Sequence, residues 1–278
     1  MVKWRALLVA GALALSLPVK ASAYHTKEDR QTDFSAFTLH QNQWRLGLFQ
    51  AEYGIFDWWN VGTYTLPWFL MPISKSPAIN LYTKVKFLDV DGWAAALRLN
   101  AFFIQLNNVA AGDLDDGDFT ATVFPITLVT SRVFNDEWTA SLESTWVQSA
   151  VRGKVDSAAD GSALGAGAQS NLQFALTGEY RVTETLALNF VGRYVPYVTA
   201  ARITTNADAG DETEVSIEAE IDASGVQNAW LLQTGFTLSW KVFNLQFGFG
   251  YGNVIFPGMK IVAPLRTIMP DFDLYFRF

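Results

Sequence analysis

From about Trp44 onward, hydrophobic and polar residues alternate along the chain with a period of two. Successive side chains of a β-strand point to opposite faces, so this period predicts strands, whereas the three- and four-residue spacing of helices is not evident. In the stretch 243–252, aromatic and aliphatic residues at odd positions alternate with Asn, Gln and Gly at even positions. The chain is therefore predicted to be all β.

The length and the faces of the predicted strands favour a membrane barrel over a soluble sandwich. Most alternating runs span roughly 10 to 15 residues, whereas soluble strands typically have about 5 to 6 and a tilted transmembrane strand needs about 9 to 11. One face of each run is apolar, and the other is small or polar. Trp or Tyr lies near the ends of several apolar faces, as in the aromatic girdles of membrane barrels. These residues are Trp93, Trp138, Tyr180, Tyr194, Trp230, Trp240 and Tyr251.

The predicted connections alternate strictly between short turns and long loops. Outer-membrane barrels have short periplasmic turns and long extracellular loops, and a sandwich has no reason to follow this order. The short turns are expected at 54–57, 89–92, 135–137, 183–185 and 242, and the long loops at 67–78, 106–118, 151–169, 200–227 and 253–269.

The pattern predicts about twelve strands in an antiparallel, up-and-down barrel. An even number places both ends of the chain on the periplasmic side. The weakest strand is 33–40, which lacks clean alternation but is required by this parity. Residues 213–221 alternate well, and we interpret them as one arm of a hairpin with 200–206 above the outer rim; a barrel of fourteen strands is the alternative. The twelve predicted strands are 33–40, 43–53, 58–66, 79–88, 92–105, 119–132, 137–150, 170–181, 185–199, 228–240, 242–252 and 270–278.

The N-terminus has the pattern of an export signal. Lys3 and Arg5 precede an apolar run of about twelve residues, and Ala21-Ser22-Ala23 provides the small residues that a signal peptidase requires. Such a run is too short for a transmembrane helix, which needs about 20 residues. We therefore expect a signal peptide at 1–23, a periplasmic tail at 24–32 and the barrel at 33–278.

The end of the chain resembles a known family. The segment with Phe272, Leu274, Phe276 and terminal Phe278 is similar to the C-terminal signature of bacterial outer-membrane β-barrel proteins, which ends on an aromatic residue. The resemblance implies a last strand that the barrel-assembly machinery recognises, and a location in the outer membrane of a Gram-negative bacterium, in contact with lipid and lipopolysaccharide. It does not identify a subfamily. We expect a monomer.

Composition excludes several classes of function. Half of the residues are hydrophobic, which argues against disorder. The absence of Cys excludes disulfides and Cys-ligated metals. A net charge of −7 argues against a nucleic-acid partner. We expect no cofactor.

The sequence offers little catalytic chemistry. The two histidines are His25, near the start of the expected mature chain, and His40, and no G-x-S-x-G motif is present. We therefore expect no enzyme activity. An acidic run invites comparison with a calcium loop, but its spacing does not match an EF-hand, so a solvated loop is favoured over a weak metal site. The run comprises Asp113, Asp115, Asp116 and Asp118.

The residues predicted to face the barrel interior are mainly basic. Charges that line a lumen tune what passes through it. The predicted inward bases are Arg45, Lys84, Lys86, Arg98, Arg181, Arg193, Lys241 and Arg277, and the predicted inward acids are Glu143, Glu179 and Asp273. This excess of bases favours a passive channel for small solutes with a mildly basic lumen. The same charges could instead form ion pairs that fill the barrel.

The alternative function is a non-conducting structural or surface-binding barrel. Its basis is the concentration of acids in two predicted extracellular loops, 106–118 and 200–227. Such loops would bind a partner directly or bridge lipopolysaccharide through divalent cations.

Overall fold

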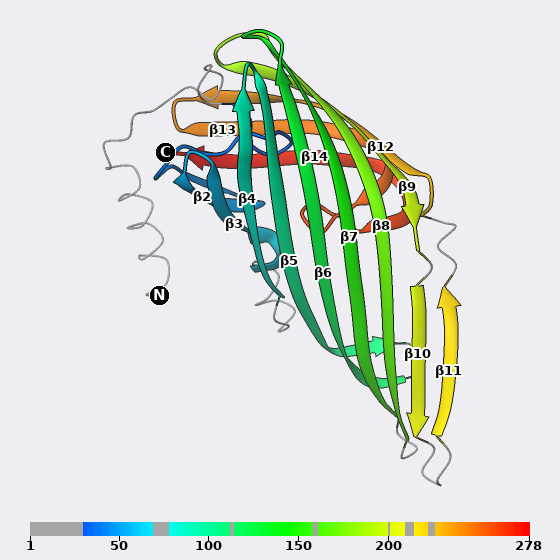
Figure 1. Cartoon of the computed structure of the whole chain (residues 1–278). Helices are drawn as coiled ribbons and strands as arrows, with labels where there is room; N and C mark the ends of the chain where they lie inside the picture. Colours follow the sequence, from blue (N-terminus) through cyan, green and yellow to red (C-terminus); the bar gives the residue numbers. More distant parts are fainter. Residues whose placement is uncertain are drawn as a thin grey trace, which may run out of the picture.

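The computed structural model describes residues 30–68, 78–111, 114–157, 161–199, 201–208, 214–221 and 226–278, without the side chains of 106–119, 153–167 and 200–225. Twelve antiparallel strands close into a barrel (Figure 1), as predicted. Each strand pairs with the next one along the chain, and β14 returns to β1, so the topology is up-and-down. The strands are β1 (Trp44–Gly47), β2 (Gln50–Phe56), β3 (Trp59–Tyr64), β4 (Ala78–Val90), β5 (Trp93–Ala111), β6 (Leu114–Val133), β7 (Trp138–Ser157), β8 (Gly161–Arg181), β9 (Leu186–Val198), β12 (Ala229–Trp240), β13 (Phe243–Ile255) and β14 (Val262–Arg277).

A hairpin stands outside the ring of twelve. It consists of β10 (Ala201–Asp208) and β11 (Glu214–Ile221), and β10 pairs with β8 at 162–168, beyond the part of β8 that pairs with β9. Figure 1 shows the hairpin at the far end of the tall sheet formed by β5 to β8. The predicted hairpin is confirmed, and the alternative of a fourteen-strand barrel is wrong.

The first predicted strand, 33–40, is wrong. These residues form bends and irregular backbone, and half of them are buried inside the barrel. The even number of strands arises instead because the predicted strand 43–53 divides into β1 and β2. The division follows a change of phase: Arg45 points inward from β1, whereas Gln50 and Glu52 point inward from β2 after a bend at Leu48 and Phe49. Residues 30–32, expected in a periplasmic tail, are buried as well, and residues 1–29 lie outside the described part of the chain.

The strands β5 to β8 are longer than predicted. Each has 19 to 21 residues, so that most of the predicted loops 106–118 and 151–169 are strand. At 3.3 Å per residue, these strands exceed the length that a bilayer requires. Polar and Gly-rich composition, which suggested loops, is compatible with hairpins that extend beyond the bilayer.

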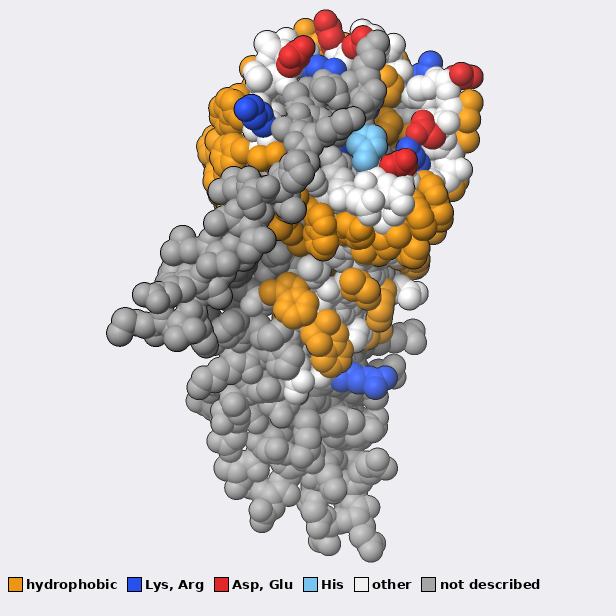
Figure 2. All heavy atoms as spheres, turned by 90° about the vertical axis from the view of Figure 1, so that its left-hand side faces the viewer, with side chains coloured by type: hydrophobic (Ala, Val, Ile, Leu, Met, Phe, Trp, Pro, Cys, Tyr) orange, Lys and Arg blue, Asp and Glu red, His pale blue; other side chains and the backbone are white. Residues whose placement is uncertain are grey.

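The outer surface of the barrel carries a hydrophobic belt. Figure 2 shows hydrophobic side chains in a band below an end that is rich in charged side chains. Trp138 stacks on Tyr180 with 4.5 Å between ring centroids, and Trp44 lies 4.6 Å from Tyr53. Both pairs join neighbouring strands at the short-turn end, where an aromatic girdle is expected. In the part of the chain that is described, no helix has the length and apolarity to cross a membrane.

The barrel wall is low on one side. Strands β1, β2 and β3 have 4, 7 and 6 residues, between β14 with 16 and β4 with 13. β1 pairs with β14 only at Tyr275–Arg277, and the amide of Leu48 donates to the carbonyl of Leu274. Among the described residues, β14 from Val262 to Asp273 is therefore paired with β13 alone. This free edge borders the barrel interior.

Candidate functional site in the lumen

The N-terminal segment 30–39, here called the plug, fills the short-turn half of the barrel. Seven of its ten residues are at least nine-tenths buried; these are Arg30, Gln31, Thr32, Ser35, Ala36, Thr38 and Leu39. Its contacts reach strands on opposite sides of the ring: Arg30 donates to Thr139 Oγ1 on β7 at 2.7 Å, and Asp33 binds Arg45 on β1. Between them, the amide of Leu39 donates to Asn60 Oδ1 on β3 at 3.1 Å. The plug therefore occupies the cross-section of the lumen at this level.

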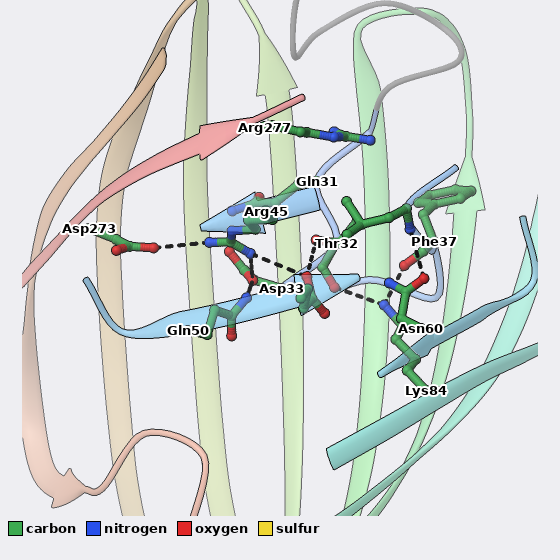
Figure 3. Close-up of polar contacts among 12 residues, drawn as sticks. Gln31, Thr32, Asp33, Phe37, Arg45, Gln50, Asn60, Lys84, Asp273 and Arg277 are labelled. Atoms are coloured by element: carbon green, nitrogen blue, oxygen red, sulfur yellow. Dashed lines mark hydrogen bonds and ion pairs between the residues drawn. The ribbon is translucent and has the colours of Figure 1, made fainter. Parts of the chain in front are cut away.

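An ion pair with Arg45 fixes the first side of the plug (Figure 3). The Arg45 guanidinium on β1 binds Asp33 of the plug and, at 3.0 Å, Asp273 of β14, and it lies 4.0 Å from the centroid of the Tyr275 ring. Burial alone would raise the pKa of the Asp33 carboxyl, but Arg45 outweighs this effect and holds that pKa below its usual value. Asp33 is therefore ionised, and the plug carries a negative charge into the lumen.

Two further cations hold the second side of the plug. Lys84 on β4 and Arg98 on β5 are directly opposite each other. Lys84 Nζ donates to the carbonyl oxygen of Thr32 at 2.8 Å and also to that of Phe37, and Arg98 Nη2 donates to the same Thr32 oxygen at 3.3 Å. In the described structure, neither cation has a carboxylate within ion-pair distance. Backbone carbonyls of the plug are thus the polar partners of two buried positive charges.

A second segment enters the lumen from the long-loop side. Residues 256–261, here called the inward loop, connect β13 to β14 and place Lys260 Nζ 3.5 Å from Glu143 Oε2. The same Glu143 oxygen accepts from Arg193 at 3.0 Å. Asn100 donates to the carbonyl of Gly258 at 3.0 Å, and Gln173 donates to that of Lys260. Because Gly258 has φ +75° and Lys260 has φ +57°, the loop turns sharply at both residues.

A cavity of about 340 Å³ lies between the plug and the inward loop. Its apolar wall comes mainly from β12, β13, β14 and the inward loop; it includes Leu231, Val254, Ile255, Phe256, Pro257 and Met269. Its charged lining residues are Asp33, Arg45, Arg98, Arg193, Lys260, Asp271 and Asp273. On β14 the cavity touches inward Met269 and Asp271 and also outward Pro270 and Phe272, so it reaches the free edge of this strand.

The structure brings most of the predicted lumen residues together inside the barrel. Lys86 is a partial exception, because its ammonium lies 2.6 Å from Asp89 at the short-turn mouth, and Arg181 is half-buried. The prediction for Lys241 is wrong: this residue is exposed in the turn between β12 and β13, with φ +51°. The buried residues are Arg45, Lys84, Arg98, Glu143, Glu179, Arg193, Asp273 and Arg277.

Five charged residues of the interior were not predicted. One is Arg30, which belongs to the segment that was assigned to a periplasmic tail. Asp33 and Lys260 belong to segments that were assigned to a strand and to an extracellular loop, and Asp271 had not been counted although it alternates with Phe272. Glu52 is buried on β2, 3.9 Å from Arg45. The sequence contains a signal for Glu52. The small or polar residues of the inward face occupy the odd positions 45 and 47 and then the even positions 50 and 52, which indicates a change of phase between them. With these residues included and Lys241 removed, the lumen holds more carboxylates than predicted.

The other candidates for chemistry lie apart from the lumen. His40 is exposed at the short-turn end, with Nδ1 3.6 Å from Asp57 Oδ1. Within the described residues, no three His, Asp or Glu side chains are grouped as a metal site. The acidic run lies outside this description: Asp113 and the side chains of Asp115, Asp116 and Asp118 are not among the described parts of the chain.

Comparison with known proteins gives similarity at the level of the fold. No family model and no curated protein matches the chain. Similar solved structures include the translocator domain of the autotransporter NalP from Neisseria meningitidis, with 11% identity and a TM-score of 0.46 over 84% of this chain and 83% of that one. They also include the TodX monoaromatic hydrocarbon channel deltaS2 mutant, with 12% identity and a TM-score of 0.45 over 87% and 68% of the two chains. Outer-membrane expressed OmpT of Vibrio cholerae has 12% identity and a TM-score of 0.36 over 93% and 74%. At such low identity, the likeness concerns the barrel fold alone.

Proposed function

We propose that the chain is an integral outer-membrane barrel of a Gram-negative bacterium and a gated passage for small anions, with the plug as its gate. The closed twelve-strand ring, the hydrophobic belt and the aromatic pairs at the short-turn end support the membrane location. Separation of inner and outer membranes on a density gradient, with detection of the intact chain, tests this location. Recovery in the inner-membrane or soluble fraction contradicts it.

The observation that carries the gating proposal is the pair of cations on β4 and β5. Like charges directly opposite each other on neighbouring strands repel, and a buried cation needs compensation for its lost hydration. Lys84 and Arg98 find this compensation in the Thr32 carbonyl, which carries only a partial charge. When the plug leaves, Lys84 and Arg98 face a wet lumen without the Thr32 carbonyl, and an anion is the partner that they lack.

The alternative is a non-conducting barrel that acts through its acidic loops. Its support is the occupation of the lumen from both ends by the plug and the inward loop. The two functions differ in one respect that is measurable: whether the plug ever leaves the lumen under conditions in which the barrel stays folded.

A reversible lock on the plug separates the two functions. The amide of Ala36 lies 2.8 Å from Ser131 Oγ on β6, and the chain has no Cys of its own. The double variant Ala36→Cys/Ser131→Cys therefore offers one disulfide between plug and wall. In planar bilayers, we expect conductance steps from the reduced variant and from the unmodified chain, and their loss on oxidation. A reduced variant and an unmodified chain that never conduct favour the alternative.

Selectivity provides the second readout. In a salt gradient, the reversal potential of the open state should indicate anion preference, and Lys84→Met should weaken this preference while it increases the open time. Lys86→Met is the matched control, because Lys86 lies at the mouth and pairs with Asp89. Cation preference in the unmodified chain, or equal effects of the two variants, contradicts the proposal.

A further inference from the structure

The cavity between the plug and the inward loop contains one carboxylate that no Lys or Arg of the described residues neutralises. Asp33 and Asp273 share Arg45, while Arg193 and Lys260 share Glu143. Arg98 binds the Thr32 carbonyl and lies 5.6 Å from the centroid of the Tyr82 ring. The remaining charge is Asp271 on β14, which has no Lys or Arg within ion-pair distance among the described residues.

A second acceptor stands beside this carboxylate. Gln246 on β13 donates through Nε2 to Asp271 Oδ2 at 3.0 Å, which directs the amide toward the carboxylate. Its other atom, Oε1, is buried and has no hydrogen-bond partner in the described structure, and Gln246 lines the cavity. A buried acceptor without a donor has lost its hydrogen bonds to water and has gained none in return. The carboxylate and the amide oxygen therefore both have capacity for hydrogen-bond donors.

We infer that the cavity binds a small apolar molecule that carries a primary ammonium group, with Asp271 as its counter-charge and Gln246 as a second acceptor. An ammonium supplies three donors and one positive charge. Leu231, Ile255 and Met269 supply the apolar surroundings for the rest of the molecule. A volume of about 340 Å³ falls in the range of roughly 300 to 1,000 Å³ that is common for ligand pockets.

A bare metal ion fits the same place less well. Calcium takes six to eight oxygen ligands, and magnesium requires near-octahedral oxygen coordination. Here one carboxylate and one amide oxygen face a wall that is mainly apolar. The Asp271 carboxylate favours a cation, and the apolar wall favours a hydrocarbon group on the same ligand.

The cavity also has an approach for such a ligand. It touches Pro270 and Phe272 on the outer face of β14 as well as Asp271 on the inner face, and so it extends around the free edge of this strand. Entry by this edge leaves the plug in place. The plug residue Asp33 lines the cavity, so the site is the one present while the plug is in the lumen, and its test requires no conductance.

The test is calorimetric titration of the purified barrel in non-ionic detergent at pH 7 with three ligands that share one apolar body. These are 4-phenylbutylamine, 4-phenylbutanol and 4-phenylbutanoate. We expect the amine to bind at least about tenfold more tightly than the alcohol and the carboxylate to bind most weakly. Asp271→Asn should remove the advantage of the amine over the alcohol, and Asp271→Glu should restore most of it.

Two further variants complete the design. Glu137→Gln changes an exposed acid in the turn before β7 and should leave all three affinities unchanged. Met269→Trp fills the cavity without a change of charge and should abolish binding of the amine even if Asp271→Asn fails to fold. Equal affinities for the three ligands, an amine preference that survives in Asp271→Asn, unchanged amine binding by Met269→Trp, or binding of calcium at Asp271 in place of the amine would each overturn the inference.

Discussion

Lys84 on β4 and Arg98 on β5 are directly opposite each other, and both donate a hydrogen bond to the carbonyl oxygen of Thr32 in the plug. One backbone atom thus bridges two cations whose mutual repulsion would otherwise act across a single pair of strands. The barrel wall and the plug depend on each other electrostatically, although the wall is continuous without the plug. This dependence makes the position of the plug sensitive to single side chains of the lumen.

The ion pair between Asp33 and Arg45 should control how often the plug leaves. Asp33→Asn removes its charge, while Arg45 keeps Asp273 at 3.0 Å, so the cost should be below the roughly 3 to 5 kcal/mol typical for a broken buried pair. We expect at least about tenfold faster maleimide labelling of a buried Ser35→Cys reporter, because tenfold corresponds to about 1.4 kcal/mol.

The control for this experiment is Asp89→Asn. Asp89 pairs with Lys86 at the mouth and is largely exposed, and exposed pairs contribute at most about 1 kcal/mol. A chain with both Asp89→Asn and the Ser35→Cys reporter should be labelled at the same rate as a chain with the reporter alone. Equal labelling of the Asp33→Asn chain and the reporter alone would show that this ion pair does not hold the plug.

Gly258 should be intolerant of a side chain. It has φ +75°, and an added Cβ would lie 2.6 Å from the Tyr64 ring. Gly258→Ala combines backbone strain with this contact, so we expect a loss of roughly 1 to 3 kcal/mol in the free energy of unfolding, measured by denaturant titration. Gly178→Ala is the matched control, since nothing lies within 4 Å of its added Cβ. Gly258→Ala/Tyr64→Leu should recover part of the loss; no recovery would leave backbone strain as the sole cause.

The strands could be predicted because the alternation that defines each strand is contained in that strand's own sequence. The expected strands 185–199 and 228–240 correspond to β9 and β12 within one residue at each end. An alternating face that contacts lipid repeats every two residues, whatever its neighbours are. The predicted hairpin at 200–221 followed from the same signal, together with the parity of the barrel.

The contents of the lumen could not be predicted in this way. The plug enters the barrel without regular structure, and its burial depends on partners such as Ser131 and Glu52 that are distant in sequence or on separate strands. Lys260 enters from the connection 256–261, which was assigned to an extracellular loop by its position between two strands, although Phe256, Met259 and Ile261 make it apolar. Lys241 was misplaced because the phase of β12 was continued into a turn with positive φ, where alternation ends.

Glu143 should be the main electrostatic support of the inward loop. It is buried on β7 and accepts from Arg193 at 3.0 Å and from Lys260 at 3.5 Å. Glu143→Gln leaves two buried cations without a carboxylate, so we expect a loss of about 3 kcal/mol or more in the free energy of unfolding. Denaturant titration measures it, with Glu137→Gln as the exposed control. A change below about 1 kcal/mol would mean that Lys260 swings out to water when the charge is removed.

The last residue should matter more for assembly in cells than for the stability of the finished barrel. The amide and carbonyl of Phe278 pair with those of Trp44 at 3.0 and 2.7 Å, so the two ends of the ring meet there through backbone atoms. Phe278→Ala keeps this pairing and removes only the aromatic ring that the resemblance assigns to the assembly machinery. We therefore expect several-fold less folded barrel in the outer membrane, measured by heat-modifiable mobility on gels, but unchanged refolding of the purified chain into detergent. Phe134→Ala, at an exposed aromatic in the turn after β6, should change neither. Equal losses in cells and in detergent would assign the ring to stability instead.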